Sequence, residues 1–154
     1  MANTYTQIYI QFVFAVNRRE SLIPREHHDE LQKYISGIVR NLEWKLIAIN
    51  NMPDHLHLFA GMNPSMSISD FMREVKANSS GFINEKSWME TRFEWQRGYG
   101  AFSYSRSQIG SVARYIENQE RHHTRKTFRE EYLDMLDKFQ VQYDARYVFD
   151  FFDD

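Results

Sequence analysis

The sequence contains no cysteine. This absence excludes a disulfide-stabilised scaffold and any metal site built on thiolates, and it suits a reducing compartment. Proline and glycine are scarce, with three and six residues, and no Pro/Gly/Ser-rich linker, internal repeat or low-complexity tract divides the chain. No segment approaches the roughly 20 apolar residues of a membrane helix, and the N-terminus lacks the pattern of a signal peptide. We therefore expect a soluble, cytoplasmic protein with no membrane partner.

Aromatic and aliphatic residues, by contrast, are plentiful. The 154 residues are 42% hydrophobic and include 12 Phe and 9 Tyr, enough for one substantial core. The net charge of −2 is unevenly distributed: residues 1–129 carry 17 basic and 13 acidic side chains, whereas residues 130–154 carry 2 and 8. This asymmetry is compatible with a nucleic-acid partner, although a solvated charged tail is the simpler interpretation. We expect a single domain over residues 1–154, with a core at about 5–123 and an acidic C-terminal helix and tail at about 127–154.

Hydrophobic periodicity predicts the order of the elements. Alternation of apolar and polar residues predicts strands at 7–16, 44–49, 55–62 and 100–105. Apolar residues at helical spacing predict helices at 24–42, 67–83, 107–122 and 127–139. The run Asn50-Asn51-Met52-Pro53 predicts a tight turn between the second and third strands. The expected fold is α+β: a ferredoxin-like split βαββαβ antiparallel sheet with helices on one face, a C-terminal helix that carries Tyr115, and an open face suited to a functional site.

Two histidines lie one residue apart in NMPDHLHLFAG, residues 51–61. In a strand, His55 and His57 point to one face and Leu56 and Leu58 to the other, where the leucines suit a helix-covered core. The histidines are about 7 Å apart along the strand by its rise per residue, so both can reach one metal ion. The alternative is a pair of partly exposed histidines that are hydrogen-bonded to their neighbours. A metal site also needs a third ligand from elsewhere.

Candidates for that ligand lie in SQIGSVARYIENQERHH, residues 107–123. Tyr115 and Gln119 are four residues apart and share one face of the predicted helix. The amide oxygen of Gln119 suits a hard cation such as Mg²⁺ or Mn²⁺. His122 and His123 are competing ligands, which a Zn²⁺ site would prefer. By composition alone, a tyrosine on an amphipathic helix is most simply explained by packing.

NMPDHLHL and, about 60 residues later, ARYIENQ together resemble motifs of the single-tyrosine HUH transposases of the insertion-sequence-200 type and their REP-associated relatives. The resemblance extends over essentially the whole chain in length, fold and order of segments. It implies that His55 and His57 bind a divalent metal, Mg²⁺ or Mn²⁺. It also implies that Gln119 completes the metal site and that Tyr115 is the nucleophile. The implied reaction cuts single-stranded DNA by transesterification, leaves a 5′-phosphotyrosine and a free 3′-OH, and rejoins new ends without ATP.

The resemblance implies partners as well: single-stranded DNA with hairpin ends, and a second copy of the chain whose tyrosine helix completes the active site in trans. Basic side chains are the candidates for DNA contact, with Tyr and Phe available to stack on exposed bases. These basic residues are Arg18, Arg19, Arg73, Lys76, Arg97, Arg114 and Arg121. Two features depart from the family: the low net charge, and the acidic end YDARYVFDFFDD, which matches no motif.

Other interpretations remain open. The same sheet would serve as a non-catalytic module similar to an RNA-recognition motif if Tyr9 and Phe59 were stacking platforms on its open face. However, the third strand lacks the Lys/Arg-Gly-Phe signature of such modules. A small metal hydrolase would use the two strand histidines with His122 or His123. A domesticated relative of the transposases would act on REP-type hairpins.

Overall fold

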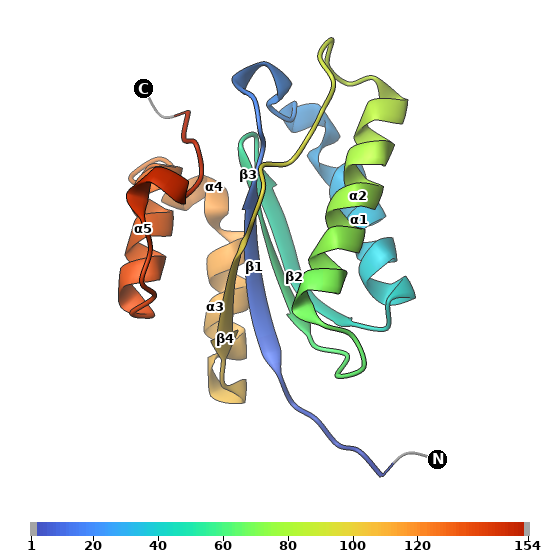
Figure 1. Ribbon diagram of the computed structural model, residues 1–154, viewed down its shortest axis with the longest axis vertical. Helices are drawn as coiled ribbons and strands as arrows, with labels where there is room; N and C mark the ends of the chain where they lie inside the picture. Colours follow the sequence, from blue (N-terminus) through green and yellow to red (C-terminus); the bar gives the residue numbers. More distant parts are fainter. Residues whose placement is uncertain (1–2, 153–154) are drawn as a thin grey trace.

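The computed structural model describes residues 3–152, and its elements follow the expected order (Figure 1). The strands are β1 Tyr9–Ala15, β2 Lys45–Met52, β3 His55–Gly61 and β4 Gly100–Tyr104. The helices are α1 His28–Asn41, α2 Ile68–Lys86, α3 Ile109–Glu117, α4 Gln119–His122 and α5 Phe128–Lys138. Short 3-10 turns lie at Arg19–Ser21, Arg25–His27, Arg106–Gln108 and Ala145–Tyr147. The predicted domain and its acidic tail extend over residues 1–154, so their first two and last two residues lie outside the described range.

The four strands form one antiparallel sheet in the order β2-β3-β1-β4. β1 and β3 are the central pair, in a register that places Val13 opposite His57 and Ala15 opposite His55. β2 pairs with the outer edge of β3, and β4 pairs with the outer edge of β1. This strand order, with two helices packed on one face, confirms the ferredoxin-like α+β fold expected from the sequence.

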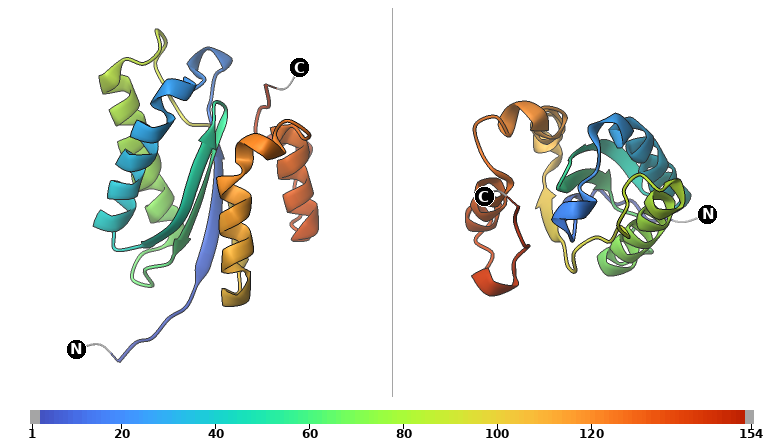
Figure 2. Two further views of the ribbon diagram at one scale, coloured as in Figure 1. Left: turned by 180° about the vertical axis from the view of Figure 1, so that it is seen from behind. Right: turned by 90° about the horizontal axis from the view of Figure 1, so that it is seen from above.

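Helices α1 and α2 cover one face of the sheet (Figure 2). Leu56 and Leu58 of β3 are fully buried in the apolar core on that side. They share it with Leu31 of α1 and with Phe71 and Val75 of α2. The predicted orientation of β3, with its leucines toward a helix-covered core, is therefore confirmed.

The opposite face is not open, contrary to the expectation from the sequence. Helices α3 and α5 lie on that side of the sheet (Figures 1 and 2). Ile116 of α3 packs on Phe59 of β3, and Phe128 and Tyr132 of α5 pack in a cluster with Val13 of β1. Apolar side chains at i and i+4 form an apolar stripe along α5. This stripe is buried from solvent only when the helix packs on the sheet.

The turn between β2 and β3 is shorter than predicted. Residues 50–52 belong to β2, and only Pro53 and Asp54 form the turn. A tertiary contact explains the difference, because Asn50 Nδ2 donates a hydrogen bond of 2.9 Å to the carbonyl of Ile116 near the end of α3. Asparagine favours turns in isolation, but here the hydrogen bond of its side chain to α3 is compatible with a strand.

The single helix predicted at 107–122 is divided into two. Helix α3 ends at Glu117, and α4 begins at Gln119. Asn118, between them, has φ −98° and ψ 22°, outside the α-helical region. The break turns the chain so that α4 starts next to the histidines of β3. Among residues 3–152, no helix has both the length and the apolar composition needed to span a membrane.

Candidate metal and nucleophile site

His55 and His57 lie on the sheet face that α3 and α5 cover, and both side chains are fully buried, not partly exposed. The Nδ1 atom of each ring has a hydrogen-bond partner, at 2.7 Å in both cases: Asp54 Oδ1 for His55 and Gln11 Oε1 for His57. An imidazole that donates its Nδ1–H keeps the Nε2 lone pair for a metal ion. Asp54 and Gln11 therefore orient the two Nε2 atoms toward the interior of the site.

Both Nε2 atoms face the carboxylate of Glu131, which belongs to α5. Glu131 Oε1 is 3.2 Å from His57 Nε2 and 3.5 Å from His55 Nε2. Ligand atoms of these three buried side chains all lie within 4.8 Å of one another. Glu131 is not among the site residues expected from the sequence. The signal was present in FREEYLDML, where this carboxylate occupies the apolar stripe of the helix between Phe128 and Tyr132.

Gln119 is fully buried and joins the same cluster. Its Oε1 atom is 3.3 Å from His55 Nε2, and its Nε2 atom donates a hydrogen bond of 2.9 Å to Glu131 Oε2. His123 reaches the cluster from the end of α4, with its Nε2 atom 3.0 Å from Gln119 Oε1 and 3.2 Å from Glu131 Oε1. The structure therefore brings the predicted glutamine to the predicted histidines.

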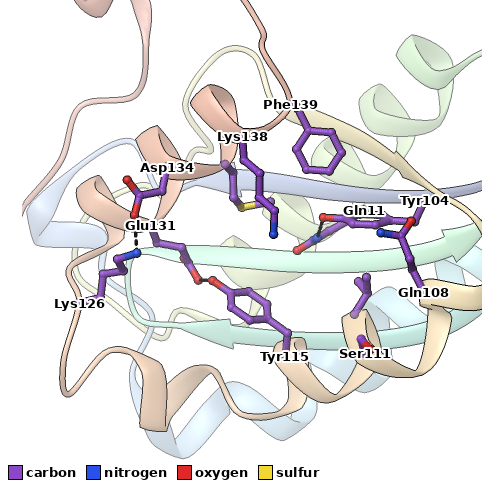
Figure 3. A pocket seen from close by; sticks show the side chains of 12 residues that line it. Gln11, Tyr104, Gln108, Ser111, Tyr115, Lys126, Glu131, Asp134, Lys138 and Phe139 are labelled. Carbon is purple, nitrogen blue, oxygen red and sulfur yellow. Dashed lines mark hydrogen bonds and ion pairs between the residues drawn. The ribbon is translucent and has the colours of Figure 1, made fainter.

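The Tyr115 side chain extends from α3 toward the cluster, and its hydroxyl donates a hydrogen bond to Glu131 Oε2 (Figure 3). Its ring meets that of His57 edge-on, with the ring centres 6.1 Å apart. The predicted nucleophile, the two histidines and the glutamine thus meet at one place within a single chain. Glu131 is the acceptor that links them.

The electrostatics of the cluster centre on this carboxylate. Burial alone would raise the pKa of Glu131, but His57 and the hydrogen bonds from the histidines outweigh it, so the pKa is strongly lowered. Burial lowers the pKa of His57. Burial also acts to lower the pKa of His55, but the bonds to Asp54 and Glu131 prevail and raise it to about 9. Burial and then the negative charge of Glu131 raise the pKa of Tyr115 above its usual value.

This set of donors fits a divalent cation. Two imidazole nitrogens, a carboxylate oxygen and the amide oxygen of Gln119 converge from β3, α5 and α4. A mixed nitrogen and oxygen set suits Mn²⁺, and the oxygen donors suit Mg²⁺. A carboxylate buried among imidazoles is costly without a cation or a proton to balance it. The residues present are therefore consistent with the divalent metal expected from the sequence.

The predicted DNA-contacting residues are dispersed over the molecule. Arg18, Arg19, Arg97, Arg114 and Arg121 are exposed, and of these Arg114 and Arg121 belong to the helices that carry Tyr115 and Gln119. Arg73 and Lys76 lie on α2, which covers the face away from the histidines. Arg73 pairs with Asp70 at 2.8 Å, and Lys76 Nζ donates to the backbone carbonyls of Gln96 and Gly98. Burial lowers the pKa of Lys76 to about 8.

The structure also bears on the two other interpretations, the RNA-recognition-like module and the metal hydrolase. Phe59, a stacking platform in the module similar to an RNA-recognition motif, is fully buried beneath α3. A base has no access to its ring. For the hydrolase, His123 does lie at the cluster, whereas the side chain of His122 is outside the part of the structure that is described.

Comparison with known families gives a match over most of the chain. The family described as "Transposase IS200 like" matches residues 4–119. This range contains β1 to β4, both histidines of β3, Tyr115 and Gln119. It ends before α5, so Glu131 lies outside the matched region.

Two curated proteins are similar over most of their own length. The ISDra2 transposase TnpA of Deinococcus radiodurans is 25% identical over 120 residues, which cover 73% of this chain and 84% of the relative. The transposase for insertion sequence element IS200 of Salmonella typhimurium is 28% identical over 128 residues, which cover 77% of this chain and 81% of the relative.

Two solved structures share the fold. A putative transposase from Deinococcus radiodurans superposes with a TM-score of 0.57 at 23% identity, covering 77% of this chain and 95% of the other. A REP-associated tyrosine transposase bound to a REP hairpin superposes with a TM-score of 0.59 at 16% identity, covering 80% of this chain and 73% of the other. At these identities the likeness concerns the fold.

Proposed function

Because the chain belongs to the IS200-like transposase family, we propose that it cuts and rejoins single-stranded DNA by metal-assisted transesterification, with Tyr115 as the nucleophile. The observation that carries this proposal is the position of the Tyr115 hydroxyl. It is hydrogen-bonded to Glu131, whose other carboxylate oxygen faces the histidines. A phosphate held at the cluster would therefore lie within reach of the phenol.

His55, His57, Glu131 and Gln119 are the proposed ligands of a divalent ion, Mg²⁺ or Mn²⁺. When bound, this ion supplies positive charge to the non-bridging and leaving oxygens of the scissile phosphate. Asp54 and Gln11 hold the histidine rings with their Nε2 atoms directed at Glu131. The ligands expected from the sequence, His55, His57 and Gln119, are neutral when they bind a metal. Glu131 adds one negative charge to them.

Tyr115 gives its phenolic proton to Glu131 Oε2 as Oη attacks the phosphorus. The new P–O bond forms, the bond to the 3′ oxygen breaks, and that oxygen takes up a proton from water. The products are a 5′-phosphotyrosine and a free 3′-OH. A second 3′-OH then attacks the phosphotyrosine and releases Tyr115. In the resting state the raised pKa of Tyr115 and the lowered pKa of Glu131 keep the proton on the phenol. Glu131 Oε2 is the acceptor already in hydrogen-bond contact with that proton.

The proposed substrate is single-stranded DNA that carries a hairpin. A REP hairpin is bound by one of the proteins that share this fold, and this supports hairpin DNA, including REP-type hairpins, as the class to test. The homodimer with active sites completed in trans remains a prediction from the resemblance. The site within one chain already contains every proposed ligand and the nucleophile, which supports action in cis.

The test is formation of a covalent adduct. Labelled single-stranded DNA hairpins are incubated with the protein and Mg²⁺ or Mn²⁺, and the products are separated on a denaturing gel. We expect a protein–DNA adduct with the native chain and none with Tyr115→Phe, because that substitution removes only the attacking oxygen.

Tyr34→Phe is the matched control. Tyr34 lies on α1, on the far side of the sheet, and stacks on Phe82, so its loss of a hydroxyl leaves the adduct unchanged. An adduct that persists in Tyr115→Phe would disprove the nucleophile assignment. No adduct with any hairpin or metal would disprove the reaction.

A further inference from the structure

A cavity of about 530 Å³ lies beside Tyr115, between α3 and α5 (Figure 3). Tyr115 and Glu131 line one end of it, and Tyr104 and Gln108 line the other. Its volume is within the range of pockets that hold a small organic ligand. We propose that this cavity binds one unpaired nucleobase of the single-stranded substrate, the base next to the phosphate that Tyr115 attacks. This inference rests on the proposed function.

The walls have the chemistry of a base-binding pocket. Phe139 and Tyr104 supply aromatic surface, with ring centres 5.4 Å apart and ring planes nearly perpendicular. A base stacks on one such ring and meets the edge of the other. The apolar side chains of Val112 and Met135 complete the walls. Stacking of this kind takes any base, because every base has a flat π face.

Polar groups at the far end suit the edge of a base. The Tyr104 hydroxyl accepts a hydrogen bond of 3.0 Å from Gln11 Nε2 and donates none within the described part of the chain. Burial raises the pKa of Tyr104, so its proton is retained at neutral pH. Gln108 Oε1 accepts from Ser105, and its amide group also lines the cavity. Hydroxyl and amide donors complement the ring nitrogens and carbonyl oxygens of bases.

The position of the cavity indicates that its ligand is a nucleotide of the substrate and not an unrelated small molecule. The space is continuous with Tyr115, so an adjacent nucleotide of the same strand must lie there or in solvent. Lys126 and Lys138 also line it, and their ammonium groups suit the phosphates of a strand that passes over it. Two carboxylates, Glu131 and Asp134, line it as well, and Lys126 pairs with Asp134.

One wall of the cavity lies outside the part of the chain that the family model matches. Met135, Lys138 and Phe139 come from α5 and the residue after it, beyond residue 119, where the match to the family ends. Gln11 connects the two halves of the site, since its amide nitrogen donates to Tyr104 and its amide oxygen is bonded to His57. A base in the cavity would therefore rest next to the group that orients a proposed metal ligand.

The test is binding of a mononucleotide to the full chain in EDTA, monitored through the side-chain amide resonances of Gln11 and Gln108. Thymidine 5′-monophosphate is the probe, and 2-deoxyribose 5-phosphate is the same molecule without a base. We expect saturable shifts with the nucleotide only. Phe139→Leu should weaken its binding about tenfold, the equivalent of about 1.4 kcal/mol of lost stacking.

Ser111→Phe provides a second variant that keeps the core intact. Ser111 is an exposed residue of α3 that lines the cavity, so a phenyl ring there occupies the proposed base site and should abolish the shifts. Tyr34→Leu, which changes an aromatic residue away from the cavity, should bind the nucleotide as the native chain does. Equal shifts with deoxyribose phosphate, or unaltered binding by Ser111→Phe, would overturn the proposal.

The outcome is separable from that of the proposed reaction, because the titration needs neither metal nor cleavage. If the native chain forms the DNA adduct but does not bind the nucleotide, the pocket is wrong and the reaction stands. If it binds the nucleotide as expected but forms no adduct, the reaction is wrong and only the binding of a base in the cavity stands.

Discussion

Glu131 is the residue at which the buried polar side chains of this protein meet. It accepts a hydrogen bond from Tyr115 and another from Gln119, and it contacts the Nε2 atoms of His55 and His57. Burial acts to lower the pKa of His55, but Asp54 and then the carboxylate of Glu131 raise it to about 9. If a cation bound at this position, its charge would replace the charge that the protonated histidine provides.

The affinity for a metal ion should therefore depend on pH. In the metal-free protein His55 is protonated below about pH 9, and its contribution to stability is present below the unfolded pKa and lost as pH rises through the folded one. Since a cation needs the neutral imidazole, we expect Mn²⁺ affinity to rise by up to about tenfold per pH unit toward pH 9, and to level off above it. Isothermal titration calorimetry in buffers of different ionisation enthalpy measures both the affinity and the released proton.

Glu131→Gln tests the carboxylate in the same titration. It keeps the size of the side chain but removes its charge, and we expect Mn²⁺ affinity to fall by about tenfold or more. Glu130→Gln is the matched control, because Glu130 is exposed and its role in the capping box of α5 is one that Gln also performs. Affinity that is independent of pH and unaffected by Glu131→Gln would rule out this metal site.

Helix α5 is the element that places Glu131 over the sheet. Thr127 accepts from the backbone of Glu130, and the Glu130 side chain accepts from the backbone of Thr127, so the first turn is fixed one residue before Glu131. The apolar side of the helix then packs on β1 and β4. Tyr132 leaves no room above Gly100, where an added Cβ would lie 2.5 Å from its hydroxyl.

Gly100→Ala should consequently destabilise the protein by about 1–3 kcal/mol, because the new methyl group forces Tyr132 away from the sheet. Gly37→Ala is the counterpart: Gly37 lies inside α1 with nothing within 4 Å of the added atom. It should stabilise the protein by about 0.5–1 kcal/mol, since alanine favours a helix. Urea denaturation gives the free energy of unfolding of both variants. A Gly100→Ala protein as stable as the native one would show that α5 does not rest on β4.

At the scale of the whole molecule, the sheet is a middle layer with helices on both faces. α1 and α2 enclose the larger apolar core, while α3 and α5 enclose the smaller clusters and the polar site. The chain returns to its own sheet after β4 (Figure 2). Residues 55–57, 115–119 and 131 thereby come together without a partner chain.

This arrangement predicts the result of an active-site complementation experiment. Tyr115→Phe lacks the nucleophile and His57→Ala lacks a proposed metal ligand, so each should form no adduct. Because the site forms within one chain, we expect a mixture of the two variants to remain inactive. The measurement is the amount of adduct formed by the mixture, with native protein diluted into each variant as the control. Adduct recovered in the mixture would establish the trans arrangement and a dimer.

The sequence by itself determined the local pattern of this protein. Alternation in β3 fixes that Leu56 and Leu58 face one side and His55 and His57 the other, because side chains of a strand alternate. The sequence also puts Tyr115 and Gln119 four residues apart, but it did not predict the break at Asn118 that brings Gln119 to His55. Strand order followed as well, since a hairpin and two helical crossovers leave few arrangements of a split βαββαβ sheet.

Only the tertiary structure decided what covers the histidines. Whether α5 lies on the sheet depends on contacts of Phe128 and Tyr132 with residues more than 100 positions earlier, such as Val13, and no local period encodes such contacts. The same is true of Asn50, which is in a strand because it bonds to the end of α3. Glu131 belongs to the site because α5 packs on the sheet. Its position in the sequence marks it as a buried acid, but the partners that make burial tolerable come from β3, α3 and α4.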